Sequence, residues 1–279
     1  MKDDKDIEVL ILDKELEERY NKERSKIKDN VQKELKGKKR KKLIFYYLLL
    51  LISLGLFLFS GYKVVMWMIE NYKTEQITTK ARKIGNVTND LYVNFKKLKK
   101  ENPDTVAWIK VNGTNIDYPV VQRADNQYYL YHSFDNSFNY AGWIFSDYRN
   151  DLNSLNKNTV IYGHGRLDGS MFGSLKNVFD ESWLKEKNNN VIFLVTEEAK
   201  YTWEIFSTYS IKSESYYIIT DFNNKEEYQE WLNTIKKRSS YDFKKKVNTK
   251  DKVLTLSTCK NDHGDRIAVH AKLINKIKN

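Results

Sequence analysis

A continuous run of uncharged, mostly apolar residues at positions 43–60 most constrains what this chain can fold into. With Gly61 and Tyr62 the run reaches 20 residues, and a helix of about 20 residues crosses the roughly 30 Å hydrocarbon core of a bilayer. Basic residues occupy all of positions 38–42, directly before the run. The positive-inside rule therefore places the N-terminus in the cytoplasm and the residues after the run outside the membrane.

Two other interpretations of the run fit less well. A cleaved signal peptide has a short basic start and a small-x-small cleavage site, whereas this run follows 42 residues and no such site follows it. A buried core helix is the second alternative, but Tyr62, Lys63 and Trp67 suit the outer interface of a membrane, where aromatic rings and long lysine side chains lie. We therefore expect a charged cytoplasmic tail over residues 1–42. We also expect a single-pass signal-anchor helix, with its outer interface, over residues 43–69 in the cell membrane.

Residues 70–103 are expected to form a helical stalk that packs on the domain that follows. Ile77, Ala81 and Ile84 recur at spacings of three and four, as in an amphipathic helix. Gly85 is a candidate break between two helices, and the Asn-Pro sequence at positions 102 and 103 marks the end of the stalk.

From residue 104 to residue 279 the pattern changes to short segments rich in β-branched and aromatic residues, separated by turn residues. Short strands at such regular spacing are typical of an antiparallel-rich barrel or sandwich. The predicted fold class is therefore mainly β, of the α+β type. The eight expected strands cover residues 106–111, 115–121, 142–146, 159–163, 191–196, 201–211, 252–259 and 266–274.

One helix is expected late in this domain, over residues 224–238. Its apolar residues follow the i, i+3, i+4, i+7 rule of an amphipathic helix. Its cap is Asn223 or Asn224, with Glu226 or Glu227 three residues on, as in a capping box.

The chain has a formal net charge of +11 and one cysteine, Cys259. No helix-turn-helix, zinc-finger or RNP-like pattern accompanies the charge, so we do not expect nucleic acid as a partner. We expect no metal site and no cofactor either. One cysteine cannot form an internal disulfide, so in an exported protein it is either an intermolecular link or a reactive thiol.

The position of Cys259 favours a reactive thiol. Cys259 closes the expected strand 252–259, and Arg266 opens the next strand after a turn-like segment at 260–265. If the two strands form a hairpin, directly opposed residues have Cβ atoms roughly 5 Å apart. A nearby cation lowers the pKa of a thiol and so increases its thiolate fraction. Cys259 beside Arg266 therefore predicts nucleophilic chemistry.

Four histidines compete for the role of proton-transfer partner. His263 lies in the turn after Cys259 and is expected to be exposed, and His132 is interpreted as a groove or surface residue. His270 lies four residues along the next strand, roughly 13 Å away and too far for direct contact with the cysteine. His164 ends an expected strand and begins a glycine-containing turn, from which its ring can enter a cleft. The spacing alone makes His164 a candidate and does not exclude the others.

The residues around these positions resemble a known family. TLSTC, residues 255–259, resembles the TLxTC signature of sortases, which are bacterial cysteine transpeptidases. TVIYGHGRLDGSMFGSL, residues 159–175, is similar to the histidine segment of that family, and Arg266 falls where the family places its catalytic arginine. YPVVQRADNQYYL at 118–130 and AGWIFSDYRND at 141–151 resemble the class B branch, sortase B, in particular.

The resemblance covers about residues 74–279. It implies a sortase-type eight-stranded β-barrel over residues 104–279, with an N-terminal helical stalk and a helix between late strands. Two features depart from the family pattern: the loop between Cys259 and Arg266 is short for class B, and the charged N-terminal tail is longer than usual. The short loop bears on the shape of the groove rim.

The resemblance also implies a mechanism and partners. Cys259 would attack the C-terminal sorting signal of a secreted protein, His164 would protonate the leaving amine, and Arg266 would stabilise the oxyanion. An amino group of a lipid-linked peptidoglycan precursor would then resolve the thioester and anchor the protein to the cell wall, outside the membrane. By similarity the substrate groove would include Asn126, Leu130, Tyr217 and Ile218. Ser257 and Thr258, on the strand that leads to the cysteine, either contact substrate or only satisfy the sheet.

Two alternatives to a transpeptidase stay open. A cysteine hydrolase would use the same residues and resolve the thioester with water, so the sequence does not separate the two activities. A non-catalytic membrane-anchored wall protein would hold Cys259 as a small buried hydrophobic residue.

Overall fold

The computed structural model of the protein describes residues 4–88, 90–212, 214–259 and 265–279. His263 and nearly all of the expected turn after Cys259 therefore lie outside the described residues. The chain forms two compact units, residues 1–66 and residues 67–279. Helix α1, Asp4–Gly85, makes up the first unit and begins the second.

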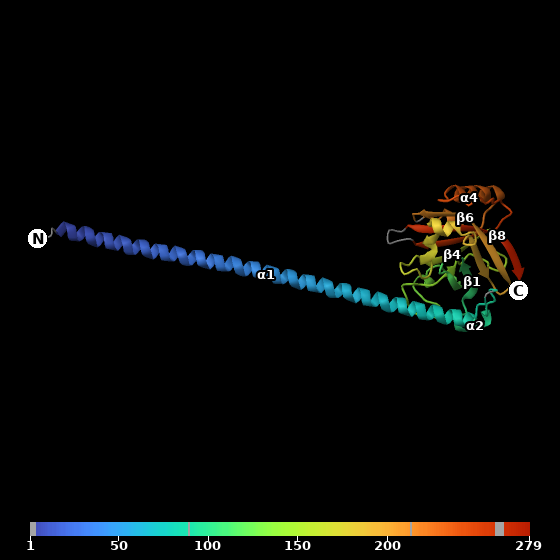
Figure 1. Cartoon of the computed structure of the whole chain (residues 1–279), viewed down its shortest axis with the longest axis horizontal. Coiled ribbons are helices and arrows are strands. Elements are labelled where there is room, and N and C mark those ends of the chain that lie inside the picture. The colour runs from blue at the N-terminus through green and yellow to red at the C-terminus, as the bar shows by residue number, and fades with distance from the viewer. Residues whose placement is uncertain (1–3, 89, 213, 260–264) are drawn as a thin grey trace. The chain divides into compact units, whose positions relative to one another are not determined.

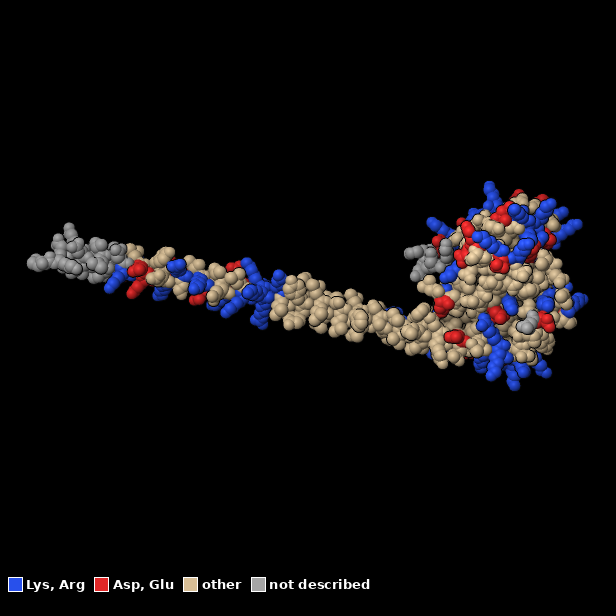
Figure 2. All heavy atoms as spheres, viewed as in Figure 1, with Lys and Arg blue, Asp and Glu red and all other residues tan. Residues whose placement is uncertain are grey.

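Along the first unit, charged side chains give way to an uncharged stretch of α1 (Figure 2). Among the described residues, one helix is long and apolar enough to cross a membrane, and none of its apolar window is buried. By length and composition this helix fits the expected span. The exposure of the window argues against a buried core helix.

The second unit is built on a closed eight-stranded barrel (Figure 1). The strands are β1 Thr105–Val111, β2 Asp117–Val121, β3 Phe145–Ser146, β4 Asn158–His164, β5 Val191–Val195, β6 Ala199–Ile211, β7 Val253–Cys259 and β8 Arg266–Lys278. Their order around the barrel is β1-β2-β3-β4-β7-β8-β6-β5. The β2·β3 and β4·β7 pairs are parallel, and the remaining described pairs are antiparallel. All eight expected strands are confirmed, and closure of the sheet decides between barrel and sandwich.

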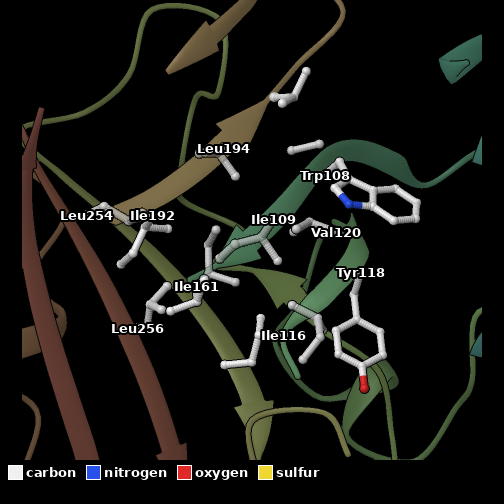
Figure 3. Close-up of a cluster of buried hydrophobic side chains, with 14 of the residues drawn as sticks. Trp108, Ile109, Ile116, Tyr118, Val120, Ile161, Ile192, Leu194, Leu254 and Leu256 are labelled. Carbon is white, nitrogen blue, oxygen red and sulfur yellow. The ribbon is translucent and has the colours of Figure 1, made fainter. Parts of the chain in front are cut away.

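The barrel core is filled by branched aliphatic side chains from several strands (Figure 3). Ile109 of β1, Ile161 of β4, Leu194 of β5 and Leu256 of β7 are all fully buried in one cluster. Because side chains alternate across a strand, Trp108 points to the other face of β1 from Ile109. Burying each such side chain contributes about 1.5–3 kcal/mol, so the alternating pattern in the sequence fixes which face of each strand is inside.

The residues expected to form a stalk divide at Gly85, the candidate break, into the end of α1 and a second helix. Helix α1 ends there, and α2, Phe95–Glu101, follows with the Asn94 side chain accepting a hydrogen bond from the Lys97 N–H at 3.0 Å. A Cβ at Gly85 would lie 2.9 Å from the Trp108 ring, so glycine permits the close approach of the helix end to β1.

The late helix α4, Lys225–Lys237, begins at the Asn224 cap. The Asn224 side chain accepts a hydrogen bond from the Glu227 N–H at 2.8 Å, and the Glu227 carboxylate accepts one from the Asn223 N–H at 2.9 Å. Its apolar face packs against β6, β7 and β8 outside the barrel (Figure 1). The remaining described helices are short: η1 Tyr128–Leu130, η2 Gly173–Phe179, α3 Glu181–Lys185 and η3 Tyr216–Ile218.

Candidate active site

The backbones of three neighbouring strands bring His164, Cys259 and Arg266 into one cross-strand row. Strand β7 lies between β4 and β8, and Cys259 pairs with His164 on the parallel side and with Arg266 on the antiparallel side. The expected hairpin register of Cys259 and Arg266 is confirmed. The parallel β4·β7 pairing adds the histidine at the same level, 95 residues upstream of the cysteine.

His164 is held by a hydrogen bond between Nε2 and the Leu130 carbonyl oxygen at 2.9 Å. A carbonyl oxygen only accepts, so Nε2 carries the proton and the neutral ring has its lone pair on Nδ1. Burial lowers the pKa of His164 below its usual range, and nearby Arg166 lowers it too, while the bond to Leu130 opposes the shift. The ring is therefore held mainly neutral at pH 7, with Nδ1 as its proton acceptor.

A groove of about 240 Å³ opens beside this row. Seven residues that the sequence singled out line it: Asn126, Leu130, His164, Ile218, Ser257, Thr258 and Arg266. Three further lining residues, Phe145, Tyr162 and Gly163, were missed. The strand period gives a signal for Tyr162, since it lies two residues before His164 and shares its face. A Cβ at Gly163 would lie 2.5 Å from the Ile144 side chain and 2.8 Å from the Phe172 ring, so glycine suits the close packing under this part of the groove.

Tyr217 is the exception among the expected groove residues. Its side chain is completely buried, and its hydroxyl lies 2.9 Å from Ser257 Oγ. The structure therefore places Tyr217 behind the groove wall, bonded to the lining residue Ser257, and not in the lining itself. Ser257 lines the groove while its hydroxyl is engaged with Tyr217, in keeping with the interpretation that this hydroxyl satisfies the fold.

One buried carboxylate, Asp147, joins the groove walls. It accepts hydrogen bonds from Asn126 Nδ2 at 3.0 Å, from the Tyr162 hydroxyl at 2.8 Å and from Arg149 Nε and Nη2, both at 2.8 Å. Arg149 Nη2 also donates to the Ile218 carbonyl at 2.9 Å. Burial alone would raise the pKa of Asp147, but the hydrogen bonds from Arg149 and Tyr162 outweigh it and lower the pKa. Asp147 is therefore an anion at neutral pH, and its hydrogen bonds position Asn126 and Tyr162 directly and Ile218 through Arg149.

The other described histidines lie elsewhere. His132 stacks on the Tyr128 ring with centroids 3.9 Å apart and does not line the groove. His270 is completely buried, and its ring nitrogens contact Thr255 Oγ1 at 2.8 Å and the Tyr209 hydroxyl at 2.9 Å. Both are accounted for by the fold. Within the described ranges, no group of three or more His, Cys, Asp or Glu residues is arranged to hold a metal ion.

Comparison with known proteins identifies the family to which this barrel and site belong. The sortase domain profile matches residues 109–274. The Listeria monocytogenes sortase B is 37% identical over 236 residues, covering 81% of this chain and 95% of the relative. The chain belongs to the sortase family, whose members are cysteine transpeptidases of cell-wall anchoring.

Similar solved structures indicate which branch of the sortase family the chain resembles. The B. anthracis sortase B in complex with AAEK1 has a TM-score of 0.67 and 36% identity, covering 75% of this chain and 99% of that one. A Staphylococcus aureus sortase B–substrate complex has a TM-score of 0.67 and 32% identity, covering 74% of this chain and 99% of that one. The class B resemblance that the sequence motifs suggested is confirmed.

Proposed function

We propose that this chain is a membrane-anchored sortase B-type transpeptidase. It cleaves the C-terminal sorting signal of secreted proteins and transfers them to an amino group of a lipid-linked peptidoglycan precursor. The observation that carries the proposal is the cross-strand row of His164, Cys259 and Arg266 beside the groove. Family membership supports acyl transfer as the reaction class.

The first half of the reaction forms a thioester. The Cys259 thiol gives its proton to His164 Nδ1, and the thiolate attacks the carbonyl carbon of the sorting signal. The Arg266 guanidinium stabilises the oxyanion of the tetrahedral intermediate. As the C–N bond breaks, the His164 imidazolium gives the proton to the leaving amine. Burial makes this imidazolium a stronger acid than a free histidine, which suits the step.

The second half reverses these roles. The incoming amine attacks the thioester carbonyl and gives a proton to His164. The thiolate then leaves, and a new amide bond joins the secreted protein to the wall precursor. The Nε2 bond to the Leu130 carbonyl holds the ring in place through both halves, because Nε2 keeps its proton throughout.

The groove supports a peptide ligand. Leu130, Phe145 and Ile218 offer apolar contacts, and the Asn126 amide offers a polar one. The S. aureus relative is described as a substrate complex, and we extend substrate binding in this groove to the present chain.

The long apolar helix and the basic residues before it support the proposed topology, which is a single span with the N-terminus in the cytoplasm and the catalytic domain outside. We retain the division into a tail over 1–42, an anchor over 43–69, a stalk over 70–103 and a catalytic domain over 104–279.

The mass of the products tests the transfer reaction. The protein is incubated with sorting-signal peptides, with and without an added amine. We expect a ligated product, in which the amine has replaced the leaving peptide, only when amine is present. Cleavage that yields the same free acid with and without amine would make the chain a hydrolase. Absence of any cleavage across the panel would support the non-catalytic alternative.

A further inference from the structure

Four exposed aromatic side chains, Trp67, Tyr131, Phe138 and Tyr140, lie outside the catalytic groove, and we call them the aromatic rim. Their exposed fractions are 48%, 48%, 63% and 63%. Three of them touch: the ring centroids of Tyr131 and Tyr140 lie 6.4 Å apart, and those of Phe138 and Tyr140 lie 5.0 Å apart. Single exposed apolar residues need no explanation, but a contiguous group of exposed rings marks an interaction surface.

The loop that carries three of these rings is tied down by Asn139. The Asn139 N–H donates to the Tyr131 carbonyl at 2.8 Å, and its buried side-chain amide donates to Ser133 Oγ at 2.8 Å and to Thr74 Oγ1 at 2.9 Å. The rings are therefore presented by a fixed surface, which keeps the entropy cost of binding low.

Contacts with α1 place this loop next to the fourth ring. The Tyr140 N–H donates to Glu70 Oε1 at 3.2 Å. Trp67 lies three residues before Glu70 and so shares its face of the helix. The same face is buried at Thr74 and exposed at Trp67. The described contacts between α1 and the barrel thus reach toward the N-terminus as far as Glu70, one turn C-terminal to Trp67.

The distance along α1 between the end of the uncharged run and Trp67 indicates what covers the aromatic rim. The uncharged run ends at Tyr62, and Trp67 lies five residues on, which is about 8 Å of α-helix. Each headgroup layer of a bilayer is roughly 5–8 Å deep. Trp67 therefore falls at headgroup level, where tryptophan and tyrosine are enriched. Glu70, to which the loop is bonded, lies eight residues past Tyr62, about 12 Å along the helix and so at the outer surface of the headgroups.

We propose that the aromatic rim contacts the outer headgroup layer of the membrane, with Trp67 within the layer and the three loop rings against its surface, and seats the catalytic domain on the bilayer. This inference rests on the proposed membrane anchoring and adds a second point of attachment to it. Leu130, which lines the groove, directly precedes Tyr131 of the rim. Seating therefore holds one wall of the groove beside the bilayer surface, where an acceptor amine carried by a lipid resides.

A fluorescent label at Phe138 tests the seating. The full chain carries Cys259→Ala, so that an added cysteine is the only thiol, and an environment-sensitive fluorophore is attached at Phe138→Cys or at Tyr92→Cys. Tyr92 is the matched control, because it is 64% exposed and follows the far end of α1. The helix from Trp67 to Gly85 separates that end from the rim by about 27 Å. Each protein is reconstituted into phosphatidylcholine vesicles, with and without a lipid that carries a quencher near its headgroup.

We expect the Phe138 label to shift to shorter wavelength and to lose most of its intensity to the quencher, while the Tyr92 label does neither. Equal responses from the two labels would overturn the proposal. A wavelength shift without quenching would also overturn it, because the rim would then be covered by protein, such as a second copy. Flotation of the vesicles distinguishes the two proposals. A protein that does not float with the vesicles would contradict the proposed membrane anchoring. A protein that floats but whose Phe138 label is not quenched would contradict only the contact of the aromatic rim with the membrane.

Discussion

At the residue scale, two histidines have opposite uses: His164 on β4 is partly buried, and His270 on β8 is completely buried, with β7 between the two strands. The Thr255 hydroxyl donates to Asn158 Oδ1 at 2.6 Å, so it accepts from Nδ1–H of His270, and Nε2 of that ring accepts from the Tyr209 hydroxyl. Both nitrogens of His270 are thus occupied. Within the described part of the chain, His164 is bonded through Nε2, to the Leu130 carbonyl. This difference makes His164 the ring that is able to exchange a proton.

Replacing Arg266 by lysine tests the oxyanion role. A lysine is a point charge and does not reproduce the planar two-donor fork of a guanidinium. Since loss of one oxyanion donor typically costs about 100- to 1000-fold, we expect Arg266→Lys to reduce kcat by about that factor. Arg238→Lys, at the end of α4 and outside the groove, is the control. Rates near those of the wild type would show that Arg266 contributes only its charge.

Replacing Asp147 by asparagine tests the positioning of the groove walls. The amide removes the charge that holds Arg149, and one hydrogen bond to a charged group contributes about 1.5–3 kcal/mol. We expect Asp147→Asn to raise KM for the sorting peptide by about tenfold or more, with a smaller effect on kcat. Asp151→Asn, an exposed turn carboxylate, is the matched control. A loss of folded protein with unchanged KM would assign Asp147 to stability alone.

At the element scale, His270 joins β8 to β7 and β6 and makes the stability of the barrel depend on pH. Burial lowers the pKa of His270 to about 3, against about 6.5 in the unfolded chain. Between these values the unfolded state binds more protons, so the free energy of unfolding falls as the pH decreases. At pH 5 the loss from His270 amounts to about 2 kcal/mol.

Urea unfolding of residues 67–279 at pH 7 and pH 5 measures this loss. We expect His270→Gln to be less stable than the wild type at pH 7 and to show a smaller decrease in the free energy of unfolding at pH 5. An equal decrease in both proteins would assign the pH dependence to other groups.

The strands and helices show which features of the fold can be predicted from the sequence alone. Alternating apolar residues and turn residues predict every strand, and the Asn and Glu pattern predicts the start of α4, because these signals are local. The parallel β4·β7 pairing joins residues 95 positions apart and has no local signal, so spacing alone could not choose among four histidines. Burial of Tyr217 and the buried role of Asp147, in a turn-like segment, likewise depend on tertiary contacts.

At the scale of the whole molecule, the only cysteine makes the proposed topology directly measurable. A thiol reagent that does not cross membranes is added to intact cells, and we expect it to label Cys259. The matched control is Ser25→Cys with Cys259→Ala, which we expect to be labelled only after lysis. The reverse pattern would contradict the proposed orientation. Absence of Cys259 labelling even after lysis would indicate a buried, inert thiol.

The intact mass of residues 67–279, taken during incubation with sorting-signal peptides, tests the central claim most directly. This fragment is a compact unit with its own core. The account predicts a thioester adduct on Cys259, which disappears as ligated product forms when an amine is added, and no adduct or turnover in Cys259→Ala. Turnover by Cys259→Ala, or an adduct on another residue, would contradict it.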